Sequence, residues 1–265
     1  METSFRGAAM RLDDIDLPKI GHQIGVGEDE LHAFIDVETR GTGFDDQGRP
    51  RILFERHKFY QYVPAAKRAA AVSAGLANKT PGGYGKESEQ YPKLFKAIAI
   101  DRKAALYSCS WGLGQVMGFS HKLAGFETVE AMVAALMADE EAHLQAAVDF
   151  IRNSGLDDEL RRHDWVGFAK GYNGANYRIN KYDTKLAEAF AKWSRIRDTP
   201  WTPGVAEQAA PVPVTPPPAE TVPAAPTETP DQKLSFWDAL RALFAVFTSK
   251  GACPLIPRRP GLPVS

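Results

Sequence analysis

Cysteine is scarce in this 265-residue chain, which contains only Cys109 and Cys253. The two lie far apart in the sequence, and Cys253 follows a proline-rich stretch, so we expect reduced thiols and synthesis in the cytosol rather than a structural disulfide. The opening residues, METSFRGAAMRLDD, lack the apolar core of a signal peptide. No run of the sequence approaches the roughly 20 apolar residues of a membrane-spanning helix. We therefore expect a protein made in the cytoplasm that depends on a separate route if it acts elsewhere.

An excess of either charge is also missing, since 32 Lys and Arg residues oppose 33 Asp and Glu residues. This balance gives no basic footprint for nucleic acid. None of the six histidines has a metal-binding spacing such as His-Glu-x-x-His, so we expect no metal and no other cofactor. Ser108 and Ser110 lack the context of a nucleophile elbow, and the chain has no phosphate-binding loop. Serine-nucleophile, zinc and nucleotide chemistry are therefore disfavoured.

Proline is rare at first and then abundant, with fourteen of the nineteen prolines at or after Pro200. This change in composition divides the chain into a main domain (1–199), a flexible Pro/Ala/Thr-rich linker (200–232), an amphipathic helix (233–250) and a disordered tail (251–265). Because such a linker cannot bury a core, catalysis or binding is assigned to the main domain.

The predicted helix at 233–250 has one strongly apolar face, formed by Phe236, Trp237, Leu240, Leu243, Phe244 and Phe247. An apolar run of about 14 residues extends roughly 21 Å, which is too short for a bilayer core of about 30 Å. We expect this helix to contact a membrane surface or a partner, or to pack back on the main domain.

The main domain is predicted to be α+β and predominantly helical. Hydrophobic periodicity predicts helices over residues 17–24, 28–39, 64–75, 92–107, 164–174 and 181–197. A longer helix is expected after Thr128, with an apolar stripe of Val129, Met132, Val133, Leu136, Leu144 and Val148. The turn signal Asp-Asp-Gln-Gly at 45–48 predicts one small β-hairpin, with 51–54 as its second strand.

Glu38 occupies an unexpected position in the helix predicted at 28–39. It falls seven residues after Leu31 on the apolar stripe, at the last turn of the helix, before the glycine loop of Gly41 and Gly43. Burial and the negative end of the helix dipole both disfavour a charged carboxylate there, so the pKa should rise, as a general acid requires. The alternative is that Glu38 lies at the stripe's edge and pairs with Arg40 or another surface charge.

Two glycine-rich stretches also indicate more than packing. In SCSWGLGQVMGF (108–119), glycines surround Gln115 and follow Trp111, which allows a ligand to approach the backbone. A tight turn beneath a packed Trp111 is the structural alternative. In GFAKGYNGANY (167–177), Tyr172 lies among glycines, either facing a ligand or as a core residue with a satisfied hydroxyl.

Three segments together resemble a known family. They are VETRGTGFDDQGRPRILFERHKFY, SWGLGQVMGFSHKLAGF and HDWVGFAKGYNGANY. In this order they resemble the N-acetylmuramidase family of phage endolysins and their bacterial relatives, within the lysozyme-like superfamily. The resemblance extends from about Leu17 to Trp193 and excludes the linker and the terminal helix.

This resemblance implies a lysozyme-like domain that cleaves the β-1,4 bond between N-acetylmuramic acid and N-acetylglucosamine in peptidoglycan. The catalytic glutamate of the family corresponds to Glu38, the residue that the helix stripe also selects. The expected substrate-binding residues are Gly43, Trp111, Gln115, Tyr172 and Asn173.

A second catalytic carboxylate is sought among Asp45, Asp46 and Glu55. Asp45 and Asp46 suit a hairpin tip. Glu55 is the preferred candidate, although Arg56 and His57 beside it also allow a structural ion pair. Since members of the superfamily with a single acid exist, the second carboxylate can also be absent.

Two other functions fit the same residues. A lytic transglycosylase uses one glutamate and yields 1,6-anhydro products, and a glycan-binding or virion protein could keep the fold without catalysis. We expect a monomer that acts on the cell wall after release by a holin-type pore, as the endolysin resemblance implies, or by secretion.

Overall fold

The computed structural model describes residues 4–38, 42–175 and 177–203. The chain divides into two units, Met1–Thr227 and Glu228–Ser265, and every described residue belongs to the first. Most of the predicted linker, the predicted helix at 233–250 and the predicted tail lie outside the described residues. No helix in the described ranges is long and apolar enough to cross a membrane.

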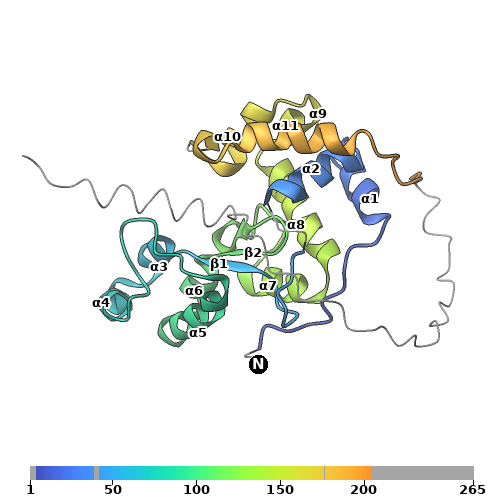
Figure 1. The fold of residues 1–265 in the computed structure, drawn as a ribbon. Coiled ribbons are helices and arrows are strands. Elements are labelled where there is room, and N and C mark those ends of the chain that lie inside the picture. Colours follow the sequence, from blue (N-terminus) through green and yellow to red (C-terminus); the bar gives the residue numbers. More distant parts are fainter. Residues whose placement is uncertain (1–3, 39–41, 176, 204–265) are drawn as a thin grey trace, which may run out of the picture. The chain divides into compact units, whose positions relative to one another are not determined.

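The described elements confirm a predominantly helical α+β domain with a small antiparallel sheet (Figure 1). The α-helices are α1 (Asp16–His22), α2 (Glu28–Glu38), α3 (Arg56–Tyr62), α4 (Ala65–Ser73), α5 (Gln90–Ile100), α6 (Arg102–Tyr107), α7 (Val129–Ala138), α8 (Glu140–Asn153), α9 (Asp157–Arg161), α10 (Trp165–Asn173) and α11 (Tyr182–Trp193). The strands are β1 (Ile52–Phe54), β2 (Cys109–Trp111) and β3 (Val116–Met117). Short 3-10 helices cover Glu87–Glu89, Gly118–Ser120 and Tyr177–Asn180.

Two groups of helices meet at the sheet. In the first, α11 packs against α2 and α10, and α1 also packs against α2. In the second, α3, α5 and α6 pack on one another or on β1 and β2. Helix α8 contacts α1 on one side and β3 on the other, so it connects the first group to the sheet (Figure 1).

Two predicted helices are each split by an aspartate. Asp101 has extended backbone angles, and its carboxylate accepts a hydrogen bond from the Ala104 N–H, which starts α6. Asp139 does the same for Ala142 and starts α8. Aspartate is a favoured N-cap because its side chain satisfies an N–H group that has no partner in the first helical turn. The single helix expected after Thr128 is therefore two helices, α7 and α8.

The predicted hairpin is also corrected. The turn at 45–48 is present, but the pairing across it is limited to an antiparallel bridge between Phe44 and Pro50, with backbone hydrogen bonds from Asp45 to Arg49 and from Arg51 to Gly43. The strand after the turn, β1, pairs instead with β2, with Ile52 opposite Trp111 and Phe54 opposite Cys109. Pairing with a strand so distant in sequence cannot be inferred from turn residues, which report only on their immediate neighbours.

The C-terminal end of the described chain folds back on α1 and α2. The Thr199 N–H donates a hydrogen bond to the Glu28 carboxylate over 2.8 Å. The Trp201 ring lies 5.3 Å from the ring of His22. The contacts of the domain therefore extend past the predicted boundary at residue 199.

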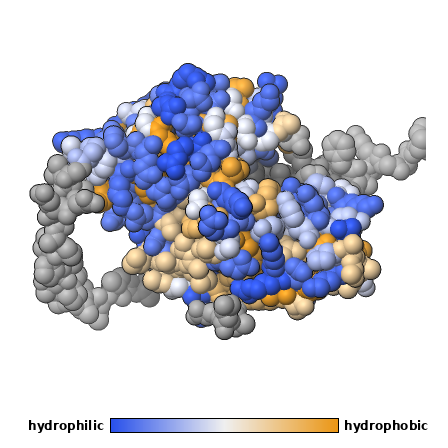
Figure 2. Space-filling model, turned by 180° about the vertical axis from the view of Figure 1, so that it is seen from behind, coloured by the Kyte–Doolittle hydropathy of each residue, from blue (hydrophilic) through white to orange (hydrophobic). Residues whose placement is uncertain are grey.

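Large apolar side chains that reach the surface are dispersed over separate elements, as with Val72 on α4, Leu123 after the second 3-10 helix and Val166 on α10. Figure 2 shows one face on which hydrophilic residues dominate the upper part, whereas weakly apolar residues gather on the left of the lower part.

Candidate active site

Glu38 is the last residue of α2, and its side chain is buried, with 8% of the residue exposed. The helix begins with three acidic residues, Glu28, Asp29 and Glu30, which the positive end of the helix dipole stabilises. Leu31 and Phe34 on the same stripe are fully buried. The stripe that anchors α2 in the core therefore carries the Glu38 carboxyl group inward, as the sequence predicted.

Burial raises the pKa of Glu38 from its ordinary value of 4.5 to about 7, because a charged carboxylate loses its hydration. A hydrogen bond from Asn173 and the positive charge of Lys185 lower the pKa, but burial has the larger effect. Near neutral pH the carboxyl group is therefore protonated in a substantial fraction of molecules. This is the protonation behaviour of a general acid.

Asn173 holds Glu38 from the end of α10. Its Nδ2 donates a hydrogen bond to Oε1 of Glu38 over 2.8 Å. Helix α10 starts at the N-cap Asp164, which accepts from the Gly167 N–H, and it stops at Gly174, whose φ of 82° suits glycine. The Oδ1 atom of Asn173 is buried and has no hydrogen-bond partner among the described residues. One amide thus fixes the acid and leaves an acceptor free beside it.

Tyr172 connects α10 to the glycine turn between β2 and β3. Its hydroxyl donates a hydrogen bond to the Gly114 carbonyl oxygen over 2.7 Å. Its ring stacks on Phe168 at 5.5 Å and meets Phe34 and Phe150 edge to face. These contacts match the interpretation of Tyr172 as a packed residue whose hydroxyl is satisfied by a backbone carbonyl, while its contact with a ligand stays a prediction.

The turn at 112–115 is held by the side chain of Gln115. Gln115 has a φ of 49°, which is uncommon for a residue other than glycine. Its Nε2 donates to the Gly112 carbonyl at 2.8 Å, and its Oε1 accepts from the Ser110 hydroxyl at 2.8 Å. The half-buried Gln115 amide is thus used within the protein and shapes the turn that Tyr172 contacts.

Two expected substrate contacts lie in the core instead. Trp111 is 1% exposed, and its indole N–H donates to the Leu106 carbonyl oxygen. The prediction of a substrate-facing Trp111 is therefore corrected in favour of a packed residue beneath the turn. Gly43 is buried as well, with its N–H bonded to Glu140 and its carbonyl oxygen accepting from the Arg51 N–H.

Glu55 directly follows β1 and precedes α3. Its N–H donates to the Ser108 carbonyl oxygen over 2.8 Å, so the sheet fixes its backbone. Burial raises the pKa of Glu55 to about 7, while Lys58 lowers it. Neither Glu38 nor Glu55 contributes to the pKa shift of the other.

The ion pair expected beside Glu55 is not formed by a charged histidine. His57 Nε2 lies 3.2 Å from Oε2 of Glu55. Burial lowers the pKa of His57 to about 4, so the imidazole is neutral near pH 7. A neutral ring does not form an ion pair, and the raised pKa of Glu55 follows from its burial.

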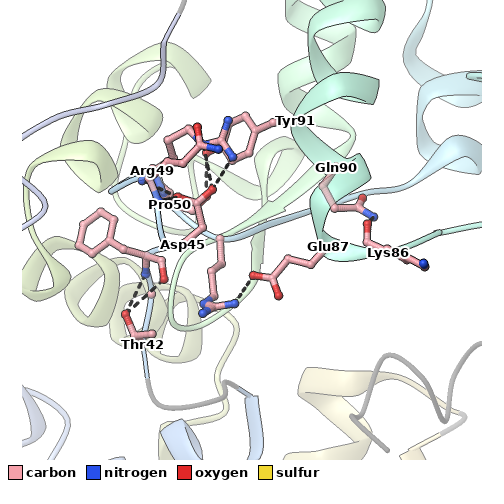
Figure 3. Close-up of polar contacts among 12 residues, drawn as sticks. Thr42, Asp45, Arg49, Pro50, Lys86, Glu87, Gln90 and Tyr91 are labelled. Carbon is pink, nitrogen blue, oxygen red and sulfur yellow. Dashed lines mark hydrogen bonds and ion pairs between the residues drawn. The ribbon is translucent and has the colours of Figure 1, made fainter. Parts of the chain in front are cut away.

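The Asp45 carboxylate is bound within its own turn (Figure 3). Its carboxylate accepts from the N–H groups of Gln47 and Arg49, and it pairs with the Arg49 guanidinium at 2.6 Å. The same guanidinium covers the ring of Tyr91, whose hydroxyl donates to the Pro50 carbonyl oxygen. Asp46 is exposed. The interpretation of Asp45 as a turn residue therefore agrees with its contacts.

Two buried polar residues near the site escaped the sequence analysis. Glu140 is 3% exposed and His143 is 1% exposed, and both lie on α8. They fall between Leu136 and Leu144 on the apolar stripe predicted after Thr128. A polar residue on an apolar stripe is the signal that selected Glu38, and it could have selected these two as well.

Known proteins resemble the chain over the part that carries this site. Residues 28–194 match the family model described as Muramidase, N-acetylmuramidase. The crystal structure of Burkholderia AP3 phage endolysin is similar to this chain at 39% sequence identity and a TM-score of 0.64, covering 70% of this chain and 71% of that one. No curated protein matches the chain. The matched residues include Glu38, Glu55, the turn at 112–115 and Asn173.

Proposed function

Because the chain belongs to the N-acetylmuramidase family, we propose that it hydrolyses the β-1,4 bond between N-acetylmuramic acid and N-acetylglucosamine, with Glu38 as the general acid. The protein is a lysozyme-like glycosidase that acts on peptidoglycan. The observation that carries the assignment of Glu38 is its burial at the end of α2, with its carboxyl group held by Asn173 and its pKa raised to about 7.

In the proposed reaction, protonated Glu38 gives its proton to the glycosidic oxygen as the bond to that oxygen breaks. The carboxylate that remains is stabilised by the Asn173 N–H, since this hydrogen bond favours the charged form. Glu38 then recovers its proton from the water that attacks the sugar. Asn173 therefore assists the step in which negative charge develops on the acid.

For Glu55 we propose the role of second carboxylate. In glycosidases with two carboxyl groups, the separation is about 5 to 5.5 Å in retaining enzymes and about 6.5 to 9.5 Å in inverting enzymes. Glu55 is half-buried, and its backbone is fixed by the sheet, as a catalytic group requires. Its raised pKa disfavours the ionised form in the free protein, so substrate binding must promote its ionisation for this role.

Tyr172 and Asn173 are proposed to line the sugar-binding surface next to Glu38. Both are half-buried, and both lie close to the Glu38 carboxyl group, Asn173 through its hydrogen bond and Tyr172 as an electrostatic neighbour. Gln115 is proposed to act on the substrate indirectly, through the turn whose shape it fixes.

Replacing Glu38 with Gln tests the proposal. The amide preserves the size of the side chain but cannot donate a carboxylic proton, so we expect clearing of purified peptidoglycan to slow by about 10² to 10⁴. Zymography and turbidity give the rate, and circular dichroism checks the fold. A variant with an unchanged spectrum that clears peptidoglycan at the wild-type rate excludes Glu38 as the acid. A wild type that binds peptidoglycan without clearing it supports a glycan-binding protein instead.

A lytic transglycosylase is the second candidate. It is favoured by one observation, namely that Glu38 is a buried acid with its pKa raised to about 7, which suits a reaction that needs a single carboxyl group. Mass spectrometry of the released muropeptides separates the two reactions. Hydrolysis leaves reducing ends, whereas a transglycosylase leaves 1,6-anhydro ends that are lighter by one water. We propose that the protein reaches this substrate after release from the cytoplasm.

A further inference from the structure

One face of α8 contacts the separate segments that build the proposed site. The face is formed by Glu140, His143, Ala147 and Phe150, which follow one another at intervals of three, four and three residues. Residues at this spacing lie on the same side of a helix. We call these four residues the α8 face.

Glu140 binds Thr42 and Gly43, which follow α2 in the sequence, and the N-terminal residues Arg11 and Leu12. Its Oε1 accepts hydrogen bonds from the Gly43 N–H at 2.7 Å and from the Thr42 hydroxyl at 2.9 Å. Its Oε2 pairs with Nε of Arg11 at 3.2 Å and accepts from the Leu12 N–H. A buried carboxylate with four donors is fully satisfied, so it fixes the backbone at Gly43, five residues after Glu38.

His143 occupies the space between this segment and the turn at 112–115. Its Nε2–H donates to the Leu136 carbonyl oxygen at 2.5 Å, and its Nδ1 accepts from the Leu113 N–H at 3.2 Å. Burial lowers the pKa of His143, which agrees with a neutral ring in this tautomer. The imidazole therefore donates one hydrogen bond to Leu136 and accepts one from Leu113.

Gly43 and Gly112 leave room for the His143 ring because they have no side chains. A Cβ atom on Gly43 would lie 2.2 Å from Nδ1 of His143, and one on Gly112 would lie 2.7 Å from the same atom. Gly112 also has a φ of 67°, where a side chain is strained. Both glycines are thus explained by close approach to His143, not by approach to a sugar.

The remaining two residues of the α8 face complete the set of contacts. A Cβ atom on Gly114 would lie 2.5 Å from Cβ of Ala147, so the turn packs directly on α8. The ring of Phe150 meets that of Tyr172 edge to face at 5.4 Å. Tyr172 in turn binds Gly114 and precedes Asn173, the partner of Glu38.

We propose that Glu140 and His143 are positioning residues of the glycosidase reaction, which set the separation between residues 42–43 and the turn at 112–115, and through that turn and Tyr172 the position of Asn173 beside Glu38. This inference rests on the proposed function, because it assigns the two residues to the site of Glu38. Neither side chain reaches solvent, so each acts through the backbone that it holds. Loosening either contact displaces the turn that Tyr172 binds, and Tyr172 directly precedes Asn173, the hydrogen-bond partner of Glu38. A displacement of about 1 Å at a catalytic group can cost about 10²-fold in rate.

The test uses two substitutions of His143 that each preserve one of its hydrogen bonds. His143→Asn keeps an acceptor near the Nδ1 position for the Leu113 N–H, whereas His143→Gln places its amide near the Nε2 position and keeps the bond to Leu136. Both lose part of the buried ring. We expect His143→Gln to have a kcat about 10- to 100-fold below that of His143→Asn, with a similar KM. In His143→Gln alone, the Leu113 amide hydrogen should exchange faster.

Val148→Ala is the matched control, because Val148 is fully buried on α8 and is not on the α8 face. It should lower the melting temperature and leave kcat within about twofold of wild type, since the cavity it leaves affects the stability of the fold and not the contacts of the α8 face. Equal kcat values for the two His143 variants overturn the proposal. So does a loss of kcat that follows the loss of melting temperature across all three variants.

Substitutions of Thr42, which binds Glu140, give a second measurement if the His143 variants do not fold. Thr42 is half-buried, so Thr42→Val should fold while losing the hydroxyl that donates to Glu140. We expect it to lower kcat at unchanged KM, and Thr42→Ser, which restores the hydroxyl, to regain most of the loss. Failure of serine to exceed valine overturns the role of Glu140.

These outcomes are separable from failure of the proposed function. If wild type releases no muropeptides, the proposed function fails, and the Leu113 exchange rates still report the contact with His143. If wild type is active and Glu38→Gln is not, the function stands and the kcat values of the His143 and Thr42 pairs decide the positioning role.

Discussion

Asn173 donates a hydrogen bond from Nδ2 to Oε1 of Glu38 across 2.8 Å, and this contact joins the end of α10 to the end of α2. The two residues are 135 positions apart in the sequence. The bond opposes the effect of burial, because it favours the ionised carboxylate whereas burial disfavours it. The pKa of about 7 is the result of this competition, and it can be altered from the Asn173 side.

Asn173→Ala should move the pH dependence of activity toward higher pH. Removing the hydrogen bond takes away a contribution that lowers the pKa of Glu38, so the acid should stay protonated at higher pH. The falling limb of kcat/KM against pH should move to higher pH. The value of kcat should fall, because Glu38 is less well oriented. Kinetics on soluble peptidoglycan between pH 5 and pH 9 measure both effects.

Asn153→Ala is the control for that experiment, because Asn153 also donates a side-chain hydrogen bond, to the Leu123 carbonyl oxygen, but at an exposed position away from Glu38. Its pH profile should match that of wild type. A limb that stays in place in Asn173→Ala, or that moves to lower pH, contradicts the assignment of this limb to Glu38.

Glu38→Gln should make the fold more stable at alkaline pH. The pKa of Glu38 is raised in the folded protein from 4.5 to about 7, so the folded state binds more protons than the unfolded state between these values. Stability that Glu38 contributes at low pH is therefore lost as the pH rises through about 7. The loss is on the order of 3 kcal/mol at 1.36 kcal/mol for each pKa unit. Glutamine does not titrate and should remove this loss.

Urea unfolding at pH 4.5 and pH 8.5 measures the effect for wild type, Glu38→Gln and the exposed control Glu188→Gln. The free energy of unfolding of Glu38→Gln should exceed that of wild type by more at pH 8.5 than at pH 4.5. The same difference at both pH values would show that Glu38 titrates normally in the folded protein.

Glu55→Gln should reduce kcat more than Asp45→Asn or Asp46→Asn. Glu55 is half-buried and follows a strand whose backbone is fixed, whereas Asp46 is exposed. Asp45 binds Arg49 within its turn, so Asp45→Asn should lower the melting temperature rather than kcat. Steady-state kinetics and thermal melts of the three variants separate these effects. A wild-type kcat for Glu55→Gln removes this residue from the mechanism.

Truncation after Pro203 should leave hydrolysis of soluble peptidoglycan intact, because the segments of the site precede it. Truncation after Thr199 should lower the melting temperature, because it removes Trp201 from its contact with His22. Both truncations should abolish binding to lipid vesicles if the apolar face predicted at 233–250 inserts at a membrane surface. Vesicle co-sedimentation and thermal melts of the three lengths are the measurements. Equal vesicle binding by full-length and truncated protein contradicts the membrane contact.

Much of the domain could be predicted from local patterns. The stripe of Leu31 and Phe34 predicted α2 and drew attention to Glu38, since a helix repeats every 3.6 residues and a misplaced acid is visible in that repeat. The N-caps Asp101 and Asp139 account for where α6 and α8 begin, but the apolar stripes that continue across them predict unbroken helices. The resemblance to N-acetylmuramidases is confirmed by the family match over residues 28–194.

The sequence by itself thus determined the stretches with a strong helical repeat, such as α2 with Glu38 at its end, because that repeat depends on neighbours a few positions away, and its three motifs indicated the family. Only the tertiary structure decided that β1 pairs with β2, that Trp111 is core, and that Glu140 holds the Gly43 segment from 97 positions away. Such contacts form when distant segments are brought together by burial of their apolar faces, and a single sequence does not record which polar groups then meet.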